Sequence, residues 1–337
     1  MITTPHTHER EAVLEGRTAA DQAPHTGRPS ALRRSIARHP LIAYFALAFA
    51  GTWSLLALLA LGRGEHGLGV LPIAIPSGPD FLLAQLSAYT GPLLAAVLVT
   101  AAAEGRAGLR QLRGRIVRPR AGIGWYLLAL LAPLAIWLGS YSVALGGQPL
   151  ADLARQPSLL LSTFLPFVLL GLLMPSLGEE TGWRGFALPR LQARFGPMRG
   201  TLLLGALHAL WHLPMFFTPN LGPFAAGPFI TFSLTAVVVT VLYTWVTNRA
   251  GGSALPAILL HASGNAASGL LNRLVPEDLP FEGWARVFVE DGWLAALGFA
   301  MVALVLIAMT QGRLGYRAEG ESLAGSPHGN SGAGARV

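Results

Sequence analysis

The sequence contains neither cysteine nor lysine, and only 12% of its 337 residues are charged. Without cysteine the chain can form no disulfide, no thiolate nucleophile and no cysteine metal site. A soluble domain carries roughly 25% charged residues, so the low charge excludes an ordinary soluble domain. The net charge of +7 comes from arginines, which fall in short loops between apolar runs. That placement indicates membrane topology rather than a nucleic-acid partner.

Long apolar runs fill the middle of the chain, and the mean hydropathy is +0.50. Each run is near the ~20 residues that span a bilayer core. Backbone groups in lipid must bond internally, so each run predicts a helix. The alternating ~10-residue segments of a membrane β-barrel are absent. We therefore predict an all-α polytopic protein of the cell membrane, with about eight transmembrane helices at about 41–61, 82–102, 124–145, 158–177, 198–217, 227–247, 253–271 and 292–311.

The arginines alternate between the two sides of these predicted helices. Arginines gather before the first helix, in the loops after the second and fourth helices and in the last tail, with Arg249 alone after the sixth helix; the opposite loops hold one, one, none and two. The positive-inside rule then places both termini in the cytoplasm. The bundle is expected over 40–312, between disordered cytoplasmic tails at 1–39 and 313–337, which are polar or rich in Gly and Ser. No sequence repeat relates the two halves, which disfavours an inverted-repeat transporter.

Two adjacent glutamates end one of these apolar runs, in the stretch SLGEETGWRGF (176–186). Glu180 and Arg184 are four residues apart and share one helical face, while Trp183 could separate Glu179 from water. An arginine can hold one carboxylate ionised while burial favours the protonated form of the other, and that separation of roles suits a general base. The alternative is an interfacial capping cluster, with Glu in a first helical turn.

Two further polar pairs with the same spacing lie in later runs. His208 and His212 stand in LHALWHLP, and His261 and Asn265 stand in LLHASGNAASG. Ionisable residues within membrane spans mark function by default, and a histidine and an amide facing a cavity could bind an oxyanion. The alternatives are a histidine packed against a backbone carbonyl, and small residues that serve only close helix packing. The three pairs together supply a base, imidazoles and an amide donor for attack by water on an amide carbonyl.

In this order the motifs resemble those of the CPBP family of intramembrane peptidases (CAAX protease and bacteriocin-processing, also Abi), which includes type II CAAX prenyl proteases. The family pattern is EExxxR, an aromatic residue with xxxH, and HxxxN, each on a different helix of an eight-helix bundle. Here the resemblance covers roughly 160–270. The second motif departs from the pattern, because His208 stands where the aromatic residue is usual. Two registers compete, one ending at His208 and one at His212; the His-Leu-Pro ending favours His212.

Carried over residue by residue, the resemblance implies that Glu179 activates water, with His212 positioning it and His208 as a neighbour or substitute. Glu180 and Arg184 would support the site. His261 and Asn265 would stabilise the oxyanion. These seven residues are the predicted catalytic set.

The resemblance also bears on a cofactor, because family members are often called metalloproteases. Glu179, His212 and His261 could hold zinc with an open fourth position. No HExxH motif is present to favour zinc, so a metal-free, glutamate-activated water is preferred.

The predicted function is an intramembrane endopeptidase that cuts a membrane-associated protein or peptide in contact with the lipid bilayer. The prenylated substrate of eukaryotic relatives is not transferred to this chain. One alternative is a non-catalytic membrane scaffold or bacteriocin self-immunity protein that retains the fold. A carrier for small solutes or ions would also use buried Glu and His, but the absence of a repeat disfavours it.

Overall fold

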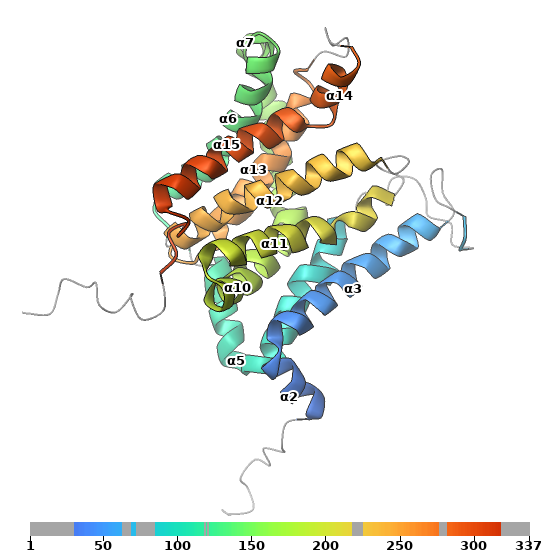
Figure 1. Cartoon of the computed structure of the whole chain (residues 1–337), viewed down its shortest axis with the longest axis vertical. Helices are drawn as coiled ribbons and strands as arrows, with labels where there is room; N and C mark the ends of the chain where they lie inside the picture. Colours follow the sequence, from blue (N-terminus) through green and yellow to red (C-terminus); the bar gives the residue numbers. More distant parts are fainter. Residues whose placement is uncertain are drawn as a thin grey trace, which may run out of the picture.

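A computed structural model describes residues 30–62, 69–71, 85–117, 119, 121–217, 225–275 and 282–317. In these residues the chain is a bundle of helices without a β-strand, which confirms the all-α polytopic class (Figure 1). Among the described residues, seven helical stretches are long and apolar enough to cross a membrane: Pro40–Leu61, Gln85–Val117, Ile123–Ala144, Leu160–Phe195, Pro197–Phe217, Ala226–Arg249 and Trp293–Thr310.

The predicted run at 253–271 forms α13 (Leu255–Leu271), which at 17 residues is shorter than each of those seven. It packs against α6 and α8 and also contacts α9 and α12. The bounds of the other elements are α2 Ala31–Arg38, α3 Pro40–Leu61, η1 Tyr89–Leu93, α5 Leu94–Val117, α6 Ile123–Ala144, α7 Gln148–Arg155, η2 Leu160–Phe164, α8 Leu165–Gly171, η3 Leu172–Ser176, α9 Leu177–Glu180, η4 Thr181–Ala187, α10 Leu188–Phe195, α11 Pro197–Trp211, η5 Leu213–Phe217, α12 Ala226–Arg249, α14 Trp284–Glu290 and α15 Trp293–Thr310.

The stretch from 85 to 117 is divided by a kink at Gly105. Gly105 has φ 62° and ψ −151°, a backbone conformation that residues with a Cβ rarely adopt. The helix before the kink is apolar, and the part after it carries Arg106, Arg110 and Arg113. The glycine therefore ends the apolar stretch and redirects the arginine-bearing part of α5.

The stretch from 160 to 195 contains three π-helical segments, η2, η3 and η4. π-turns inside α-helices are rare and often lie at functional sites, and η4 follows directly after Glu180. At Gly182, in η4, an added Cβ would lie 2.4 Å from the Tyr44 hydroxyl and 2.7 Å from the Pro92 carbonyl oxygen. This glycine therefore lets the glutamate-bearing stretch approach α3 and η1 closely.

Both predicted tails include residues that the structure describes as ordered. Residues 1–29 and 318–337 lie outside the described residues, but residues 31–38 form α2 and residues 313–317 are ordered. α2 packs on α5, and Arg33 Nε donates a hydrogen bond to the Ala102 carbonyl at 2.9 Å. Leu314 is fully buried among residues of α12 and α15. The prediction of disorder was wrong for these two segments, because tertiary packing orders sequences that lack a long apolar period.

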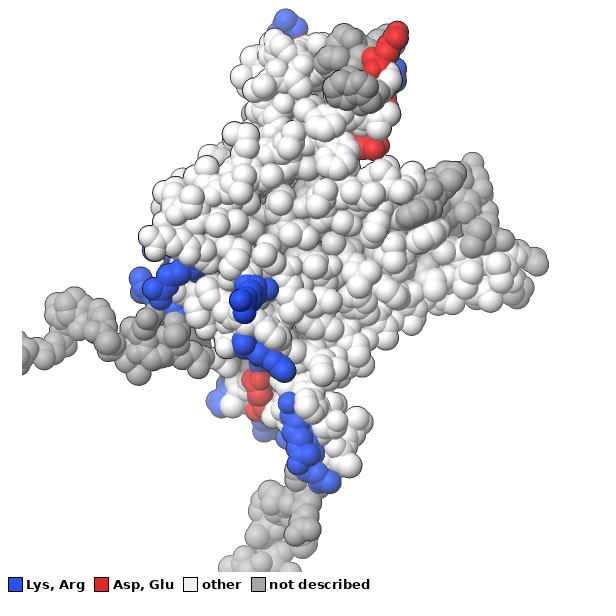
Figure 2. Space-filling model, in the orientation of Figure 1, with Lys and Arg blue, Asp and Glu red and all other residues white. Residues whose placement is uncertain are grey.

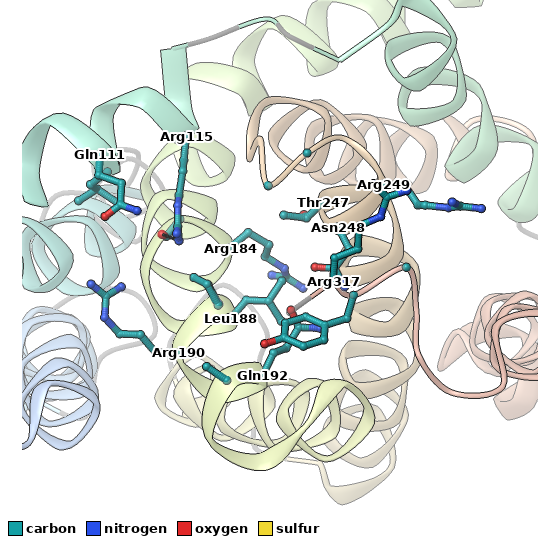
Figure 3. A pocket seen from close by; sticks show the side chains of 18 of the residues that line it. Gln111, Arg115, Arg184, Leu188, Arg190, Gln192, Thr247, Asn248, Arg249 and Arg317 are labelled. Carbon is teal, nitrogen blue, oxygen red and sulfur yellow. Dashed lines mark hydrogen bonds between the residues drawn. The ribbon is translucent and has the colours of Figure 1, made fainter. Parts of the chain in front are cut away.

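Charged side chains gather at the two ends of the bundle, as Figure 2 shows for one face. Both described ends of the chain, at α2 and after α15, lie toward the arginine-rich end (Figures 1 and 2). Two of the hollows in the described structure are relevant to function. One of about 740 Å³ lies among these arginines (Figure 3). The other, of about 500 Å³, reaches from the buried glutamates toward Gly292, at the start of α15 and the opposite end of the bundle.

Candidate functional site

The three polar pairs from the sequence meet in the interior of the bundle. α9 and η4 carry Glu179, Glu180 and Arg184. α11 carries His208 and ends just before His212, and α13 carries His261. Both glutamates are almost fully inaccessible, at 4% and 0% exposed. Burying charged groups in this way is costly unless they are paired, and the structure supplies partners for both.

Glu179 pairs with His208. Its Oε2 atom lies 2.8 Å from His208 Nε2, and no hydrogen bond to its Oε1 atom forms among the described residues. His212 lies next in line, with its Nδ1 donating to the His208 carbonyl oxygen at 3.0 Å. Since Nδ1 of His212 is the donor, its Nε2 atom remains available to the cavity. The sequence left two registers open and favoured His212, whereas the imidazole that contacts Glu179 is that of His208.

Glu180 lies in a separate, fully buried network. Arg184 Nη1 is 3.0 Å from both oxygens of the Glu180 carboxylate. The second guanidinium nitrogen donates to the Thr240 hydroxyl at 3.1 Å, and that hydroxyl donates to the Ala236 carbonyl at 2.7 Å. His261 Nδ1 lies 2.9 Å from Glu180 Oε1. Glu180 thus joins Arg184 to His261.

Two members of this network were not predicted from the sequence, and both come from α12. Thr240 anchors the guanidinium of Arg184, and the Tyr243 ring lies under it, 4.6 Å from Arg184 Cζ to the ring centroid. Such a position favours a cation–π interaction. The available signal was a threonine and a tyrosine in the apolar segment AVVVTVLYTW, which is also typical of ordinary helix packing.

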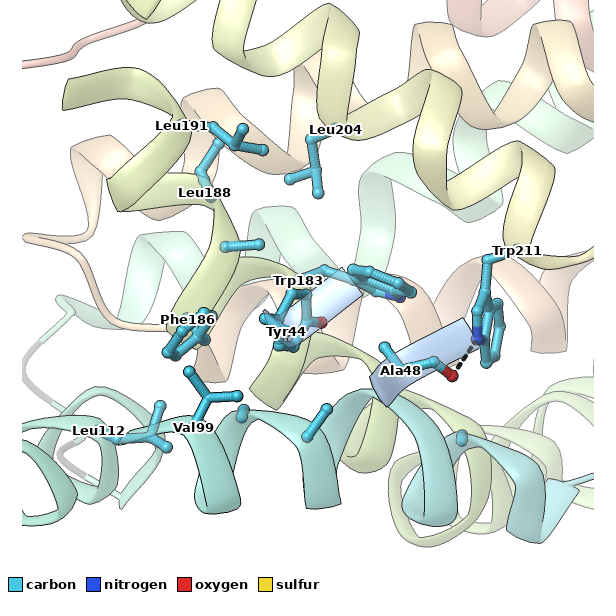
Figure 4. Close-up of a cluster of buried hydrophobic side chains, with 14 residues drawn as sticks. Tyr44, Ala48, Val99, Leu112, Trp183, Phe186, Leu188, Leu191, Leu204 and Trp211 are labelled. Atoms are coloured by element: carbon cyan, nitrogen blue, oxygen red, sulfur yellow. Dashed lines mark hydrogen bonds between the residues drawn. The ribbon is translucent and has the colours of Figure 1, made fainter. Parts of the chain in front are cut away.

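An aromatic cluster closes one side of the site (Figure 4). Trp183 is fully buried and makes edge contacts with Tyr44 and Trp211, at centroid distances of 5.8 and 5.6 Å. Its ring centroid lies 5.1 Å from that of His208. Trp211 Nε1 donates to the Ala48 carbonyl at 3.3 Å, which fixes the cluster to α3. These rings cover the pair formed by Glu179 and His208 on the side that faces α3.

The cavity of about 500 Å³ begins at the polar groups and continues between apolar walls. Glu179, His208, His212 and His261 line its inner end, and Asn265 lines it one turn farther along α13. The Asn265 amide makes no hydrogen bond with another described residue. The walls include aromatic and aliphatic side chains of several helices: Leu56, Trp137, Phe216, Phe232, Val239 and Phe299. A cavity of this volume and composition can hold part of an apolar chain next to polar groups.

One group of side chains could hold a metal ion. The ligand atoms of Glu179, His208 and His212 lie within 4.8 Å of one another. The set predicted from the sequence combined Glu179 and His212 with His261, but His261 points its Nδ1 at Glu180 instead. The group in the structure therefore contains His208 in place of His261.

Two comparisons with known proteins concern the same part of the chain. The family model for type II CAAX prenyl endopeptidase Rce1-like proteins matches residues 161–267. CAAX prenyl protease 2 of Methanococcus maripaludis is 29% identical over 148 residues, which cover 42% of this chain and 54% of that relative. The chain thus matches about half the length of this curated relative. Both findings confirm the resemblance to the CAAX protease-like CPBP family, and residues 161–267 are the segment that carries it.

Proposed function

We propose that this protein is an intramembrane endopeptidase of the CAAX type, in which Glu179 activates the attacking water. The observation that carries the proposal is the separation of the two glutamates. Glu179 faces the cavity and has one carboxylate oxygen bonded to His208 and the other available, whereas Glu180 is engaged by Arg184 and His261. A base must reach the water whose proton it takes, and of the two glutamates Glu179 alone lines the cavity.

In the proposed reaction, Glu179 accepts a proton from water while the water oxygen bonds to the carbonyl carbon of the scissile peptide. His208 donates Nε2–H to Glu179 Oε2 and holds the carboxylate in place. When the tetrahedral intermediate collapses, the proton on Glu179 passes to the leaving nitrogen as the C–N bond breaks. The products are a carboxylic acid and an amine, and the base returns to its starting state.

The oxyanion of the intermediate would be stabilised from α13. Glu180 accepts a hydrogen bond from His261 Nδ1–H, which orients the other ring nitrogen, Nε2, toward the cavity. With both nitrogens protonated, His261 donates Nε2–H to the oxyanion, and the Asn265 amide donates from the next turn of the same helix. Donors fixed before the reaction stabilise developing charge strongly, because they need not reorganise.

Glu179, His208 and His212 also form a donor set that zinc accepts, with a fourth position left open. A bound zinc ion would polarise the scissile carbonyl. The direct hydrogen bond of 2.8 Å between Glu179 Oε2 and His208 Nε2 uses the same two atoms that would bind the ion. Pairing and ligation are alternative uses of these atoms, and we propose the metal-free reaction because the sequence holds no HExxH motif.

The proposed substrate is a membrane-associated protein or peptide whose chain enters the apolar part of the cavity. The walls contributed by Trp137, Phe232 and Phe299 suit apolar side chains or a lipid-like group next to the scissile bond. The length and hydropathy of the seven described spans make this a multi-pass membrane protein, and we propose the cell membrane as its location.

The test compares the termini of membrane proteins by mass spectrometry in cells that express wild type, Glu179→Gln or Glu290→Gln at equal levels. Glu290 is an exposed carboxylate bonded to Arg286 outside the site, so its substitution is a matched control. Precursors should remain uncut only with Glu179→Gln. Identical termini in all three strains under several growth conditions would contradict the proposal and favour a non-catalytic scaffold.

A further inference from the structure

The hollow of about 740 Å³ at the arginine-rich end is separate from the proposed catalytic cavity, and no residue lines both. It lies between α5, η4 and α10 on one side and the end of α12 and the chain after α15 on the other (Figure 3). Its size lies within the range of small-molecule sites, roughly 300–1,000 Å³. The proposed endopeptidase reaction makes no use of it.

The charge of its lining is strongly positive. Five arginines and one carboxylate, Glu104, line the hollow; the arginines are Arg115, Arg184, Arg190, Arg249 and Arg317. Arg190 bonds to Glu104, and Arg184 is paired with Glu180 behind the wall. Arg249 and Arg317 are exposed and have no carboxylate partner among the described residues. The field at the opening therefore attracts anions.

The residues that line the hollow also include buried polar groups that lack a hydrogen-bond partner among the described residues. They are Thr100 Oγ1, Arg184 Nε, Gln192 Nε2 and Thr247 Oγ1. Each of these four side chains is at most 2% exposed, and each lines the hollow. Buried polar groups are normally bonded, so an unpaired group in a native structure needs an explanation. The nitrogen atoms of Arg184 and Gln192 can only donate hydrogen bonds, and the two threonine hydroxyls can donate as well. Such a set of donors suits a ligand rich in acceptor oxygens.

We propose that this hollow binds a phosphate-bearing anion, either the headgroup of an anionic lipid or a free phosphorylated compound. Exposed arginines at the opening would attract the anion and bond its outer oxygens, since guanidinium groups pair well with phosphate. The buried donors Gln192, Thr247 and Arg184 Nε would bond the oxygens that enter farthest. The bound anion would also fix the Arg184 guanidinium from the side opposite Glu180.

The test uses the full-length protein in a neutral detergent and follows its thermal unfolding with increasing inorganic pyrophosphate, against sodium chloride of equal ionic strength. A second arm follows unfolding in nanodiscs of phosphatidylglycerol and of phosphatidylcholine. We expect saturable stabilisation beyond that given by salt. Stabilisation by phosphatidylglycerol alone would assign the site to a lipid headgroup, and stabilisation by pyrophosphate would assign it to phosphate in either form.

The variants separate a built site from general attraction to a basic surface. Arg249→Gln with Arg317→Gln should weaken binding roughly tenfold or more, because two charge-assisted bonds are lost. Arg194→Gln with Arg199→Gln is the matched control: it removes the same charge at the same end of the bundle, but neither residue lines the hollow. Thr247→Val changes no charge and should weaken binding roughly threefold or more, by removing one buried donor.

Three outcomes would overturn the proposal. The first is equal weakening by both arginine pairs together with no effect of Thr247→Val, which would leave only diffuse electrostatic attraction. The second is the absence of stabilisation by either phosphate source. The third is binding that occurs only when Glu319 and Glu321 are replaced by Gln, because the carboxylates that follow Arg317 in the chain would then be the natural occupants.

Discussion

Glu179 and Glu180 are neighbours in the chain, but their carboxylates lie in two different regions of the molecule. Glu180 is bound to Arg184 on one side and His261 on the other, with no exposed surface. Glu179 lines the cavity and is bonded to a single imidazole. If Glu179 is the base, as proposed, burial alone does not distinguish a reactive carboxylate from a structural one. Glu180 has an arginine partner and does not line the cavity, whereas Glu179 lines the cavity and pairs with a histidine.

The largest expected effect comes from removing the charge of Glu179. Glu179→Gln keeps the shape of the side chain but cannot accept a proton from water, so cleavage of a precursor identified from its termini should fall by about 10³-fold or more. Thermal stability in detergent should remain near that of wild type, because no arginine loses its counter-charge. Wild-type cleavage by Glu179→Gln would assign the base to another residue.

Glu180→Gln should act mainly on stability. It leaves the buried Arg184 guanidinium without a carboxylate, and breaking a buried pair in this way costs about 3–5 kcal/mol. Thermal unfolding of the purified protein measures this loss. The double variant Glu180→Gln with Arg184→Met should recover much of the stability, because the uncompensated charge is gone. It should not recover cleavage, since the partner of His261 has lost its negative charge. Recovery of both properties would make the role of Glu180 purely structural.

The two histidines of α11 should differ in importance. His208→Ala removes the partner of Glu179 and should lower kcat about 10²-fold, whereas His212→Ala should lower it by no more than about tenfold. The ratio of the two rates tests which register carries the motif. A larger loss for His212→Ala would restore the register that the sequence favoured, with His208 as its neighbour.

The smallest effect is expected from metal removal. If Glu179 and His208 act as a directly bonded pair, dialysis against a chelator should change the cleavage rate by less than about twofold. Loss of activity with chelator, and its return with added zinc, would assign Glu179, His208 and His212 to a metal site. Metal content measured on the same samples would confirm that the ion had been removed.

The sequence predicted the helices well because each span must be apolar over a fixed length. It also predicted that Glu180 and Arg184, and His261 and Asn265, share helical faces, since spacing of four residues places them there. It did not predict that Glu179 contacts His208 rather than His212, because each of these histidines ends one possible register of the second motif. The contact depends on how the glutamate-bearing stretch packs against α11, which no pattern in one sequence reveals.

Contacts between distant elements were also beyond the sequence. Thr240 and Tyr243 join the site because α12 packs against α11 and α13, and their residue types are common in membrane helices. The helix α2 and the buried Leu314 belong to segments whose composition is typical of disordered chain. In both places order depends on a tertiary neighbour, on α5 for α2 and on α12 and α15 for Leu314.

The kink at Gly105 has a consequence for the depth of the protein in the bilayer. The part of that span before the kink, from residue 85 to residue 104, is at most about 30 Å long at 1.5 Å per residue, which is close to the thickness of the hydrocarbon core. The arginines that follow the glycine then lie at the level of the lipid headgroups, where they resist displacement in either direction. In a bilayer, Gly105 would therefore mark the depth of the bundle, and it would set how far below the headgroups a substrate of the proposed reaction must reach to meet Glu179.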